Sequence, residues 1–467
     1  MEQHKNITWA NRTAFFLLCA ILIFTTLIYG AVHQPIIAIV YLTAAALVVL
    51  WAVDSFIRGT IVLNRSLIQI PLLALFIYGM IQIIPIGSLA EIGGVSGIPR
   101  TLSLEPYWTK LTSFHILALA IFFAGFLTFI NSAKRIRKIV LLITIFGFIY
   151  AFFAILQYFL SPNKIYGIYE SPFAVPFGSF VNRHNFAAYM EMSMALPLGL
   201  LFSGSVPRDK RLLYLTAIGL MGIALLMSGS RGGLVSLLAE IAFLTILTAN
   251  AKSTWNLVLK SGLAVLLVGI IIAGSILVGG ESSLTRFAET ASTNDITTNR
   301  THIWSVTWDV IKNKPVLGNG IGAFDVAYSK FDTFNGMERV EQAHNDYLQV
   351  WADAGLVGLA IGIFFLYGLI RNGFQSIKTQ NLYRRGVVAG AFAGCFAILV
   401  HSVFDFVLHT TAISLLFLVL VALLVNGGTG YPDDTEERME RHKRRKKMRK
   451  AVVTPFNKGK RKELERG

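Results

Sequence analysis

The sequence IVLLITIFGFIYAFFAILQYFL, residues 139–160, decides the fold class of this chain. The run has 22 residues, and none of them is charged. About 20 apolar residues in a helix are enough to cross the hydrocarbon core of a bilayer, whereas a surface helix of a soluble protein keeps one polar face. This stretch therefore predicts a membrane-spanning helix.

Similar apolar runs occur along most of the chain, and together they predict an all-α polytopic membrane protein with about twelve spans. The run 185–203 is the weakest of them because it contains Glu191 and Pro197. The predicted spans are 13–30, 35–53, 67–84, 112–130, 139–160, 185–203, 211–228, 232–249, 261–279, 346–370, 386–404 and 410–426.

The composition of the whole chain agrees with this class. Of the 467 residues, 54% are hydrophobic and 15% are charged, and the mean hydropathy is +0.60. An average soluble domain has roughly 25% charged residues, so this chain has too little charge to cover several soluble domains. The two cysteines, Cys19 and Cys395, lie inside apolar runs without CxxC or Cys/His spacing, which argues against a disulfide framework or a zinc site.

The formal net charge of +16 would by itself be compatible with a nucleic-acid partner or an anionic substrate. Twelve spans with a cytoplasmic N-terminus, however, place 31 of the 42 Lys and Arg residues on the cytoplasmic side, in agreement with the positive-inside rule. We therefore expect both termini to be cytoplasmic and no nucleic acid to bind. The basic tail 427–467 is expected to be disordered, and it either contacts anionic lipid or only fixes the topology.

Three predicted external segments are longer than a tight turn: 85–111, 161–184 and 280–345. In the longest of them, apolar residues recur at helical spacing over 301–313, with two tryptophans beside them. This pattern predicts an amphipathic helix in the headgroup layer that ends before Pro315. Such a segment could form a lid over the outer face of the spans.

The sequence PVLGNGIG, residues 315–322, follows this helix and is superficially similar to a nucleotide-binding glycine loop. No strand is predicted before it, and it is expected outside the cell, so it does not predict a nucleotide site. A flexible backbone close to a phosphate or a sugar remains the functional alternative.

Two arginines on the predicted external side could bind an anion. Arg231 lies in the turn SGSRGG, residues 228–233, where glycines leave the guanidinium and the backbone amides open to a close approach. Arg300 immediately precedes the amphipathic helix. Each arginine could instead extend from a span end to the interface, but two guanidinium groups at one membrane face suit a lipid diphosphate.

His344 opens the sequence HNDYL, residues 344–348, at the start of the tenth predicted span. Histidine is the usual general base at neutral pH because its unperturbed pKa is about 6.5, although a histidine at a span end is often only interfacial. Asp346 and Asp353 follow on the chain, and either could orient the ring. Asp346 is the weaker candidate because it does not share a helix face with His344.

Other polar residues in or near the spans have no assigned chemistry. Glu191 needs a partner, for which Arg183 is one possibility, because a charged side chain in a span costs about 2.5–3.5 kcal/mol on insertion scales. Glu240 is a second acid without an evident role. Three further residues recur at intervals of four: His401, Asp405 and His409. We expect these three to straddle a short turn, and we predict no metal site for them.

Taken together, these segments resemble the O-antigen ligase family, which also includes O-antigen polymerases and bacterial protein O-oligosaccharyltransferases. The order of the motifs, and their placement around one large loop, carry the resemblance over residues 175–370. The matching segments are FVNRHN (180–185), SRG (230–232), Arg300 with Trp304, KPVLGNGIG (314–322), HNDYL (344–348) and AG (354–355).

The resemblance implies that a glycan is transferred from an undecaprenyl-diphosphate carrier to a hydroxyl acceptor at the periplasmic face of a bacterial inner membrane. It implies that Arg231 and Arg300 bind the diphosphate and that His344 assists the acceptor hydroxyl. Inversion at the anomeric carbon is expected, without an obligatory metal or another cofactor, because the arginines can balance the charge of the leaving group. Further candidate substrate-binding residues from the same motifs are Arg183, His184, Asn185, Asn345 and Tyr347.

The resemblance also implies one transmembrane glycan-transferase domain over residues 1–426, with the ligase-like core at 175–370 and the large periplasmic loop at 280–345. The motifs do not identify the acceptor: lipid A–core is our first choice, and a growing O-antigen or exopolysaccharide chain, or a protein, is the alternative.

A secondary transporter or lipid flippase is the competing class of protein. It would use Glu191, Glu240 and Asp353 as intramembrane ion or proton sites. Transport would not need the segment 280–345, whereas glycan transfer would.

Overall fold

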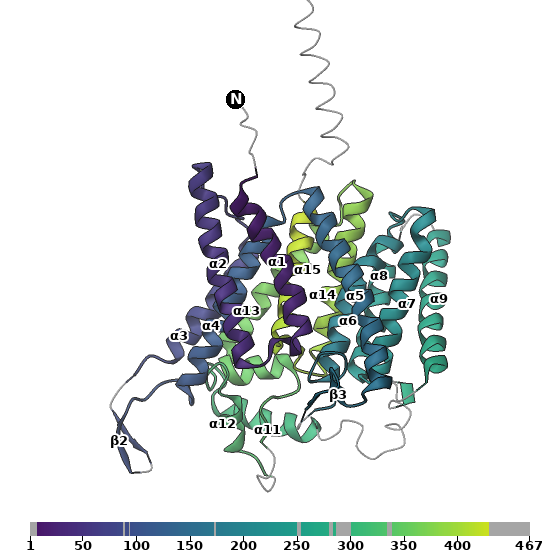
Figure 1. Ribbon diagram of the computed structural model, residues 1–467. Coiled ribbons are helices and arrows are strands. Elements are labelled where there is room, and N and C mark those ends of the chain that lie inside the picture. Colours follow the sequence, from purple (N-terminus) through teal and green to yellow (C-terminus); the bar gives the residue numbers. More distant parts are fainter. Residues whose placement is uncertain are drawn as a thin grey trace, which may run out of the picture.

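The computed structural model describes residues 7–86, 89–92, 94–171, 174–249, 254–279, 284–285, 300–333 and 339–428. Each of the twelve predicted spans is a helix, and these helices stand side by side in one bundle (Figure 1). They are α1 (Trp9–Leu27), α2 (Gln34–Arg58), α3 (Ile70–Gln82), α4 (Pro106–Phe129), α5 (Ala133–Leu160), α6 (Arg183–Phe202), α7 (Arg211–Met227), α8 (Arg231–Thr248), α9 (Thr254–Val278), α13 (Asp346–Ser376), α14 (Leu382–His401) and α15 (Thr411–Gly427).

The prediction of an all-α, multi-pass membrane protein is confirmed. Among the described residues, nine helices are long and apolar enough to cross a membrane, and the segments Leu67–Gln82 and Thr411–Gly427 are shorter apolar helices. The predicted basic tail lies almost wholly outside the described residues, as do parts of the segment 280–345.

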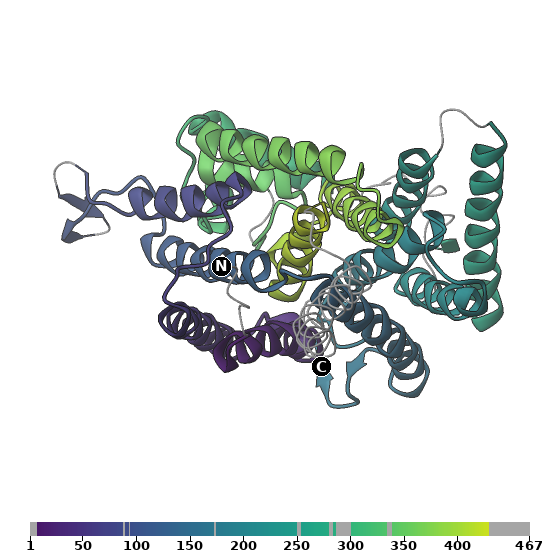
Figure 2. The same ribbon diagram turned by 90° about the horizontal axis from the view of Figure 1, so that it is seen from above.

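Helices α6, α14 and α15 form the buried centre of the bundle. Every residue of α15 is buried, and α15 stands in the middle when the molecule is viewed along the helices (Figure 2, yellow). Helices α6 and α14 pack closely because glycines lie between them: a Cβ atom at Gly199 would lie 2.3 Å from the backbone nitrogen of Gly390. Small residues allow this close approach, which is how helices associate without a hydrophobic driving force between them.

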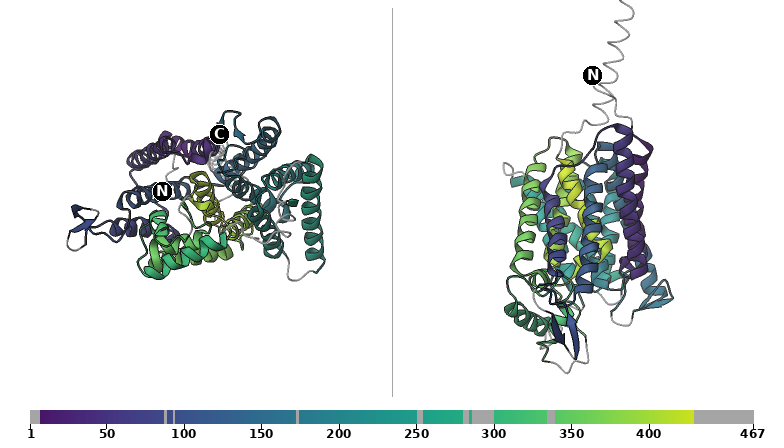
Figure 3. Two further views of the ribbon diagram at one scale, coloured as in Figure 1. Left: turned by 90° about the horizontal axis from the view of Figure 1, so that it is seen from below. Right: turned by 90° about the vertical axis from the view of Figure 1, so that its left-hand side faces the viewer.

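The extramembrane segments gather at one end of the bundle, opposite the N-terminus (Figures 1 and 3), and we call it the loop-bearing end. In the part of the chain that the structure describes, they include two small antiparallel hairpins and two short helices. Their bounds are β1 (Ala90–Ile92) with β2 (Val95–Ile98), β3 (Lys164–Ile165) with β4 (Tyr169–Glu170), α11 (Arg300–Asn313) and α12 (Phe324–Ser329).

Helix α11 matches the predicted amphipathic helix, but its apolar face contacts protein. Val306 and Val310 are buried in a small core with Phe324 and Tyr328 of α12 and with Ala352 of α13. The apolar pattern that suggested insertion into the headgroup layer is therefore explained by packing against neighbouring helices. This core holds α11 against the first turns of α13.

The glycine-rich segment 315–322 packs against a break in α13. At Gly355 the backbone has φ 62° and ψ −158°, and a Cβ atom there would lie 2.2 Å from the carbonyl oxygen of Val316. The amide of Leu356 donates to the carbonyl of Pro315 (3.0 Å), and the amide of Gly320 donates to the carbonyl of Asp353 (2.9 Å). The loop thus provides partners for backbone groups that the break leaves unpaired, which a helix within a membrane requires.

We expect Gly355→Ala to lower the free energy of unfolding. A left-handed φ at a residue other than glycine costs about 1–3 kcal/mol by itself, and the overlap of the new Cβ atom with backbone adds to that cost. The control is Gly362→Ala in the same helix, where a Cβ atom would meet nothing within 4 Å. The measurement is the midpoint of thermal unfolding in detergent. Equal midpoints for the two variants would contradict this account of the break.

Candidate active site

Most of the sequence-predicted site residues lie at or near the starts of helices at the loop-bearing end. The helices that begin there include α6 at Arg183, α8 at Arg231, α11 at Arg300 and α13 at Asp346. Asn182, Ser230 and Asn345 cap three of them, since each side chain accepts a hydrogen bond from an amide in the first turn. Helix N-termini carry partial positive charge, so their convergence favours an anion.

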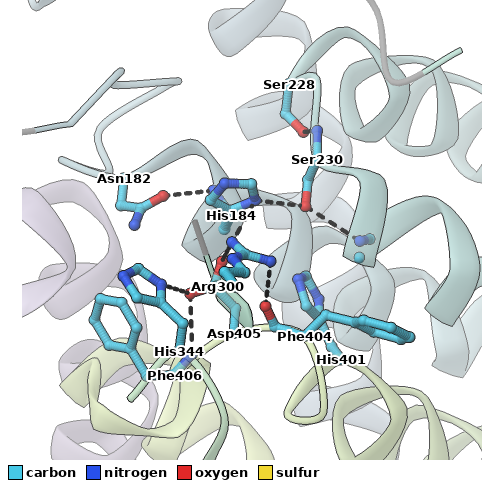
Figure 4. A network of polar contacts seen from close by, with 12 residues as sticks. Asn182, His184, Ser228, Ser230, Arg300, His344, His401, Phe404, Asp405 and Phe406 are labelled. Carbon is cyan, nitrogen blue, oxygen red and sulfur yellow. Dashed lines mark hydrogen bonds and ion pairs between the residues drawn. The ribbon is translucent and has the colours of Figure 1, made fainter. Parts of the chain in front are cut away.

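The carboxylate of Asp405 connects these segments. Asp405 lies in the turn between α14 and α15, and only 3% of its side chain is exposed. Arg300 donates to its Oδ2 atom (3.0 Å), and the Nδ1 atom of His344 lies 3.2 Å from its Oδ1 atom. The Nδ1 atom of His184 lies 3.6 Å from Oδ2 (Figure 4). One buried carboxylate therefore holds three predicted site residues together.

Asp405 is ionised at neutral pH. Burial raises the pKa of its carboxyl group, but His184, His344 and Arg300 outweigh burial and hold this pKa well below its usual range. An ionised carboxylate can only accept hydrogen bonds, so the Nδ1 atom of His344 carries the proton that it shares with Asp405. In the neutral imidazole with this tautomer, Nε2 is the ring atom with a free lone pair.

The expectation that Asp346 or Asp353 orients His344 is wrong. Asp346 binds the Nδ1 atom of His409 at 3.0 Å, and Asp353 accepts hydrogen bonds from Gln349 and from the amide of Gly322. Asp405 takes that role, 61 residues away along the chain. Its spacing with His401 and His409 was visible in the sequence, and the three do straddle a turn, but spacing alone did not connect Asp405 to His344.

His344 has a strained backbone. Its φ is 49°, in the left-handed region that residues other than glycine rarely adopt. The next two residues hold it there: the Asn345 side chain donates to the carbonyl of Val403 (3.0 Å), and the Asp346 amide donates to the carbonyl of Ser402 (2.9 Å). Such strain costs about 1–3 kcal/mol and is typical of functional sites.

The two predicted arginine segments meet this cluster from different sides. Arg300 donates to the backbone carbonyl of Phe404 as well as to Asp405. Arg231 is the first residue of α8, and the preceding Ser230 places its Oγ atom 2.9 Å from His184 Nδ1. The starts of α6, α8 and α11 are thus connected through His184 and Asp405.

The remaining predicted binding residues lie at the same helix starts. Arg183 and Asn185 flank His184 in the first turn of α6. The side chain of Asn345 caps α13, and the hydroxyl of Tyr347 donates to the carbonyl of Leu399 in α14 (2.7 Å). Asn345 and Tyr347 therefore have structural contacts, and a role for any of these residues in substrate binding stays a prediction.

A fully buried histidine–glutamate pair lies next to the turn that carries Asp405. The Nδ1 atom of His401 lies 3.2 Å from both carboxylate oxygens of Glu191, and both side chains are 0% exposed. The partner of Glu191 is thus His401, whereas the sequence suggested Arg183. The His401 carbonyl accepts hydrogen bonds from the amides of Phe404 and Asp405, so this pair fixes the turn that carries Asp405.

Two further observations concern metal binding and the buried acid Glu240. Within the described ranges, no three His, Cys, Asp or Glu side chains are arranged to hold a metal ion. Glu240 is buried in α8, and in the part of the chain that the structure describes its carboxylate oxygens have no hydrogen-bond partner.

We expect Glu191→Gln to lower the free energy of unfolding by about 3 kcal/mol, because it removes one charge from a pair buried inside the bundle. The control is Glu170→Gln, which alters an exposed pair with Lys164 and should leave the unfolding midpoint nearly unchanged. Thermal unfolding in detergent measures both variants. If Glu191→Gln behaves like the control, the pair does not fix the turn.

Comparison with known proteins agrees with the motifs. Residues 216–363 match the family model described as O-antigen ligase. The matched range contains Arg231, Arg300 and His344, and it ends inside α13, before Asp405. No match is found among curated proteins.

Proposed function

We propose that this chain, which carries an O-antigen ligase domain and is a glycan-transfer enzyme, takes its glycan from an undecaprenyl-diphosphate carrier. The acceptor in this proposal is a hydroxyl group at the loop-bearing end, and the membrane is a bacterial inner membrane with that end in the periplasm. The observation that carries the proposal is the meeting of two arginine segments, several helix N-termini and a histidine–aspartate pair around Asp405.

Arg231, Arg300 and the starts of α6 and α8 would bind the diphosphate. Guanidinium groups keep their charge and bind phosphate oxygens in pairs, and helix N-termini add backbone amides and partial positive charge. The diphosphate leaves with the electron pair of the bond to the anomeric carbon. Positive groups already in place would stabilise the charge that grows on its oxygens.

His344 would receive the proton of the acceptor hydroxyl. Its Nδ1 atom is bound to Asp405, so Nε2 is the atom available to the hydroxyl. As the proton moves to Nε2, the acceptor oxygen attacks the anomeric carbon from the side opposite the diphosphate, which inverts that centre. The buried carboxylate of Asp405 would stabilise the imidazolium that forms.

The acceptor in this proposal is lipid A–core. Extension of a glycan on its own carrier, as by a polymerase, and transfer to a protein hydroxyl would use the same donor chemistry. These three differ only in which acceptor a reconstituted enzyme glycosylates.

The contacts of the intramembrane acids favour transfer over transport. Glu191 is bound to His401, and Asp353 accepts hydrogen bonds from Gln349 and the Gly322 amide. Two of the three acids that a transporter or flippase would use are therefore held in structural contacts, which leaves Glu240 as the acid that distinguishes the two classes.

We expect His344→Gln to lower kcat/KM for glycan transfer by at least about 100-fold, because the general base is lost. Arg300→Lys should lower it by about 100-fold, because a single ammonium cannot reproduce the paired contacts of the guanidinium. The measurement is transfer by full-length protein in proteoliposomes with an undecaprenyl-diphosphate-linked glycan and lipid A–core.

The matched control is Arg339→Lys, an exposed arginine of the same loop that binds Asp325. It should keep activity within about twofold, as expected for an exposed pair. Full activity of His344→Gln together with loss of activity in Glu240→Gln would contradict the proposal and support transport.

A further inference from the structure

A second histidine–aspartate pair lies on the same turn, and the reaction described above does not use it. The Nδ1 atom of His409 is 3.0 Å from Oδ1 of Asp346, and the amide of Leu408 donates to Oδ2 of the same carboxylate (3.4 Å). His409 belongs to the short 3-10 helix Val407–His409, just before α15, and Asp346 is the first residue of α13.

Both pairs join the start of α13 to the turn between α14 and α15. In one pair the histidine comes from the α13 segment, and in the other it comes from the turn. His344 binds Asp405, and Asp346, two residues after His344, binds His409. In each pair the carboxylate is covered and the imidazole is accessible. The exposed side-chain fractions are 3% for Asp405 and 32% for His344, against 9% for Asp346 and 38% for His409. Both imidazoles are therefore partly exposed, and each is held by a buried carboxylate.

The ring of Phe406 lies near the rings of both histidines. Its ring is 4.9 Å from the ring of His344 and 6.3 Å from that of His409 between centroids, and it meets both at steep angles, 77° and 67°. The Phe406 side chain is itself only partly buried. An aromatic ring near groups that can donate and accept hydrogen bonds suits a sugar, which has an apolar ring face and hydroxyls at its rim.

Two carboxylates, those of Asp346 and Asp353, act on His409. Burial lowers the pKa of His409, but its hydrogen bond to Asp346 and the charges of Asp346 and Asp353 outweigh burial and raise it. A carboxylate–imidazole pair offers both hydrogen-bond donors and acceptors, which are the groups that bind the hydroxyls of a sugar.

We propose that His409, Asp346 and Phe406 form an acceptor subsite that binds the sugar ring bearing the attacking hydroxyl. The acceptor is then a carbohydrate, not the hydroxyl of a protein side chain. This inference rests on the proposed function, whose lipid A–core acceptor is a carbohydrate, and it adds the residues that bind the acceptor sugar. His409 binds a hydroxyl neighbouring the one that reacts, and it exchanges no proton with the substrate.

The test is steady-state kinetics of the full-length protein in proteoliposomes with an undecaprenyl-diphosphate-linked glycan as donor. Three acceptors from the source bacterium are compared: lipid A–core, the carrier-linked glycan itself and a peptide containing Ser and Thr. We expect one of the two carbohydrate acceptors to be used. His409→Gln should raise the KM for that acceptor about tenfold, the effect of one lost hydrogen bond, and should change the KM for the donor by less than about twofold.

Two further variants keep the test independent of folding defects. Phe406→Leu removes the aromatic ring but keeps an apolar side chain, and it should raise the acceptor KM in the same way. His302→Gln is the matched control, because His302 pairs with Asp332 (3.6 Å) outside the cluster and should leave both KM values unchanged.

Several results would overturn the inference. It fails if the acceptor KM is unchanged in both His409→Gln and Phe406→Leu, if the donor KM rises instead, or if kcat falls as far as in His344→Gln. It also fails if the peptide is the acceptor that is glycosylated. If the unaltered protein transfers glycan to none of the three acceptors, the proposed function itself fails, which separates the two hypotheses.

Discussion

The buried carboxylate of Asp405 provides the interactions on which the arrangement of the site depends. Four helix starts, which belong to segments far apart in the sequence, lie near this turn, and Asp405 contacts residues at three of them. Without its negative charge, Arg300 and the positive ends of several helices would repel one another around a poorly hydrated centre. The same charge favours the tautomer of His344 whose Nδ1 atom carries the proton, so one side chain acts on both the packing and the tautomer of the residues around it.

Close backbone packing fixes the position of the site relative to the helices of the bundle. Glycines between α6 and α14 bring these helices together, and the Glu191–His401 pair fixes the end of α14 just before the turn. On the other side, the loop 315–322 fits against the break at Gly355 and positions the start of α13. Backbone contacts of this kind tolerate no added side chain, which explains why so many glycines surround a site that is rich in charge.

Hydropathy alone predicted the twelve helices, the loop-bearing end and the bounds of α11, because each depends on local composition and period. The pairs His344–Asp405 and Glu191–His401 could not be predicted in this way, because each joins residues that are far apart in the chain and whose meeting depends on how the helices pack. The apolar face of α11 was misassigned for a related reason: a period of 3.6 residues shows that a face is covered, but lipid and protein cover it equally well.

The central claim is that the loop-bearing end holds a lipid diphosphate between the starts of α6, α8 and α11. The most direct test is an electron cryo-microscopy structure of the full-length protein in nanodiscs with undecaprenyl diphosphate. The account predicts density for the diphosphate within hydrogen-bond distance of Arg300 and Arg231, beside His344. Diphosphate bound at the opposite end of the bundle, or bound away from both arginines, would contradict it.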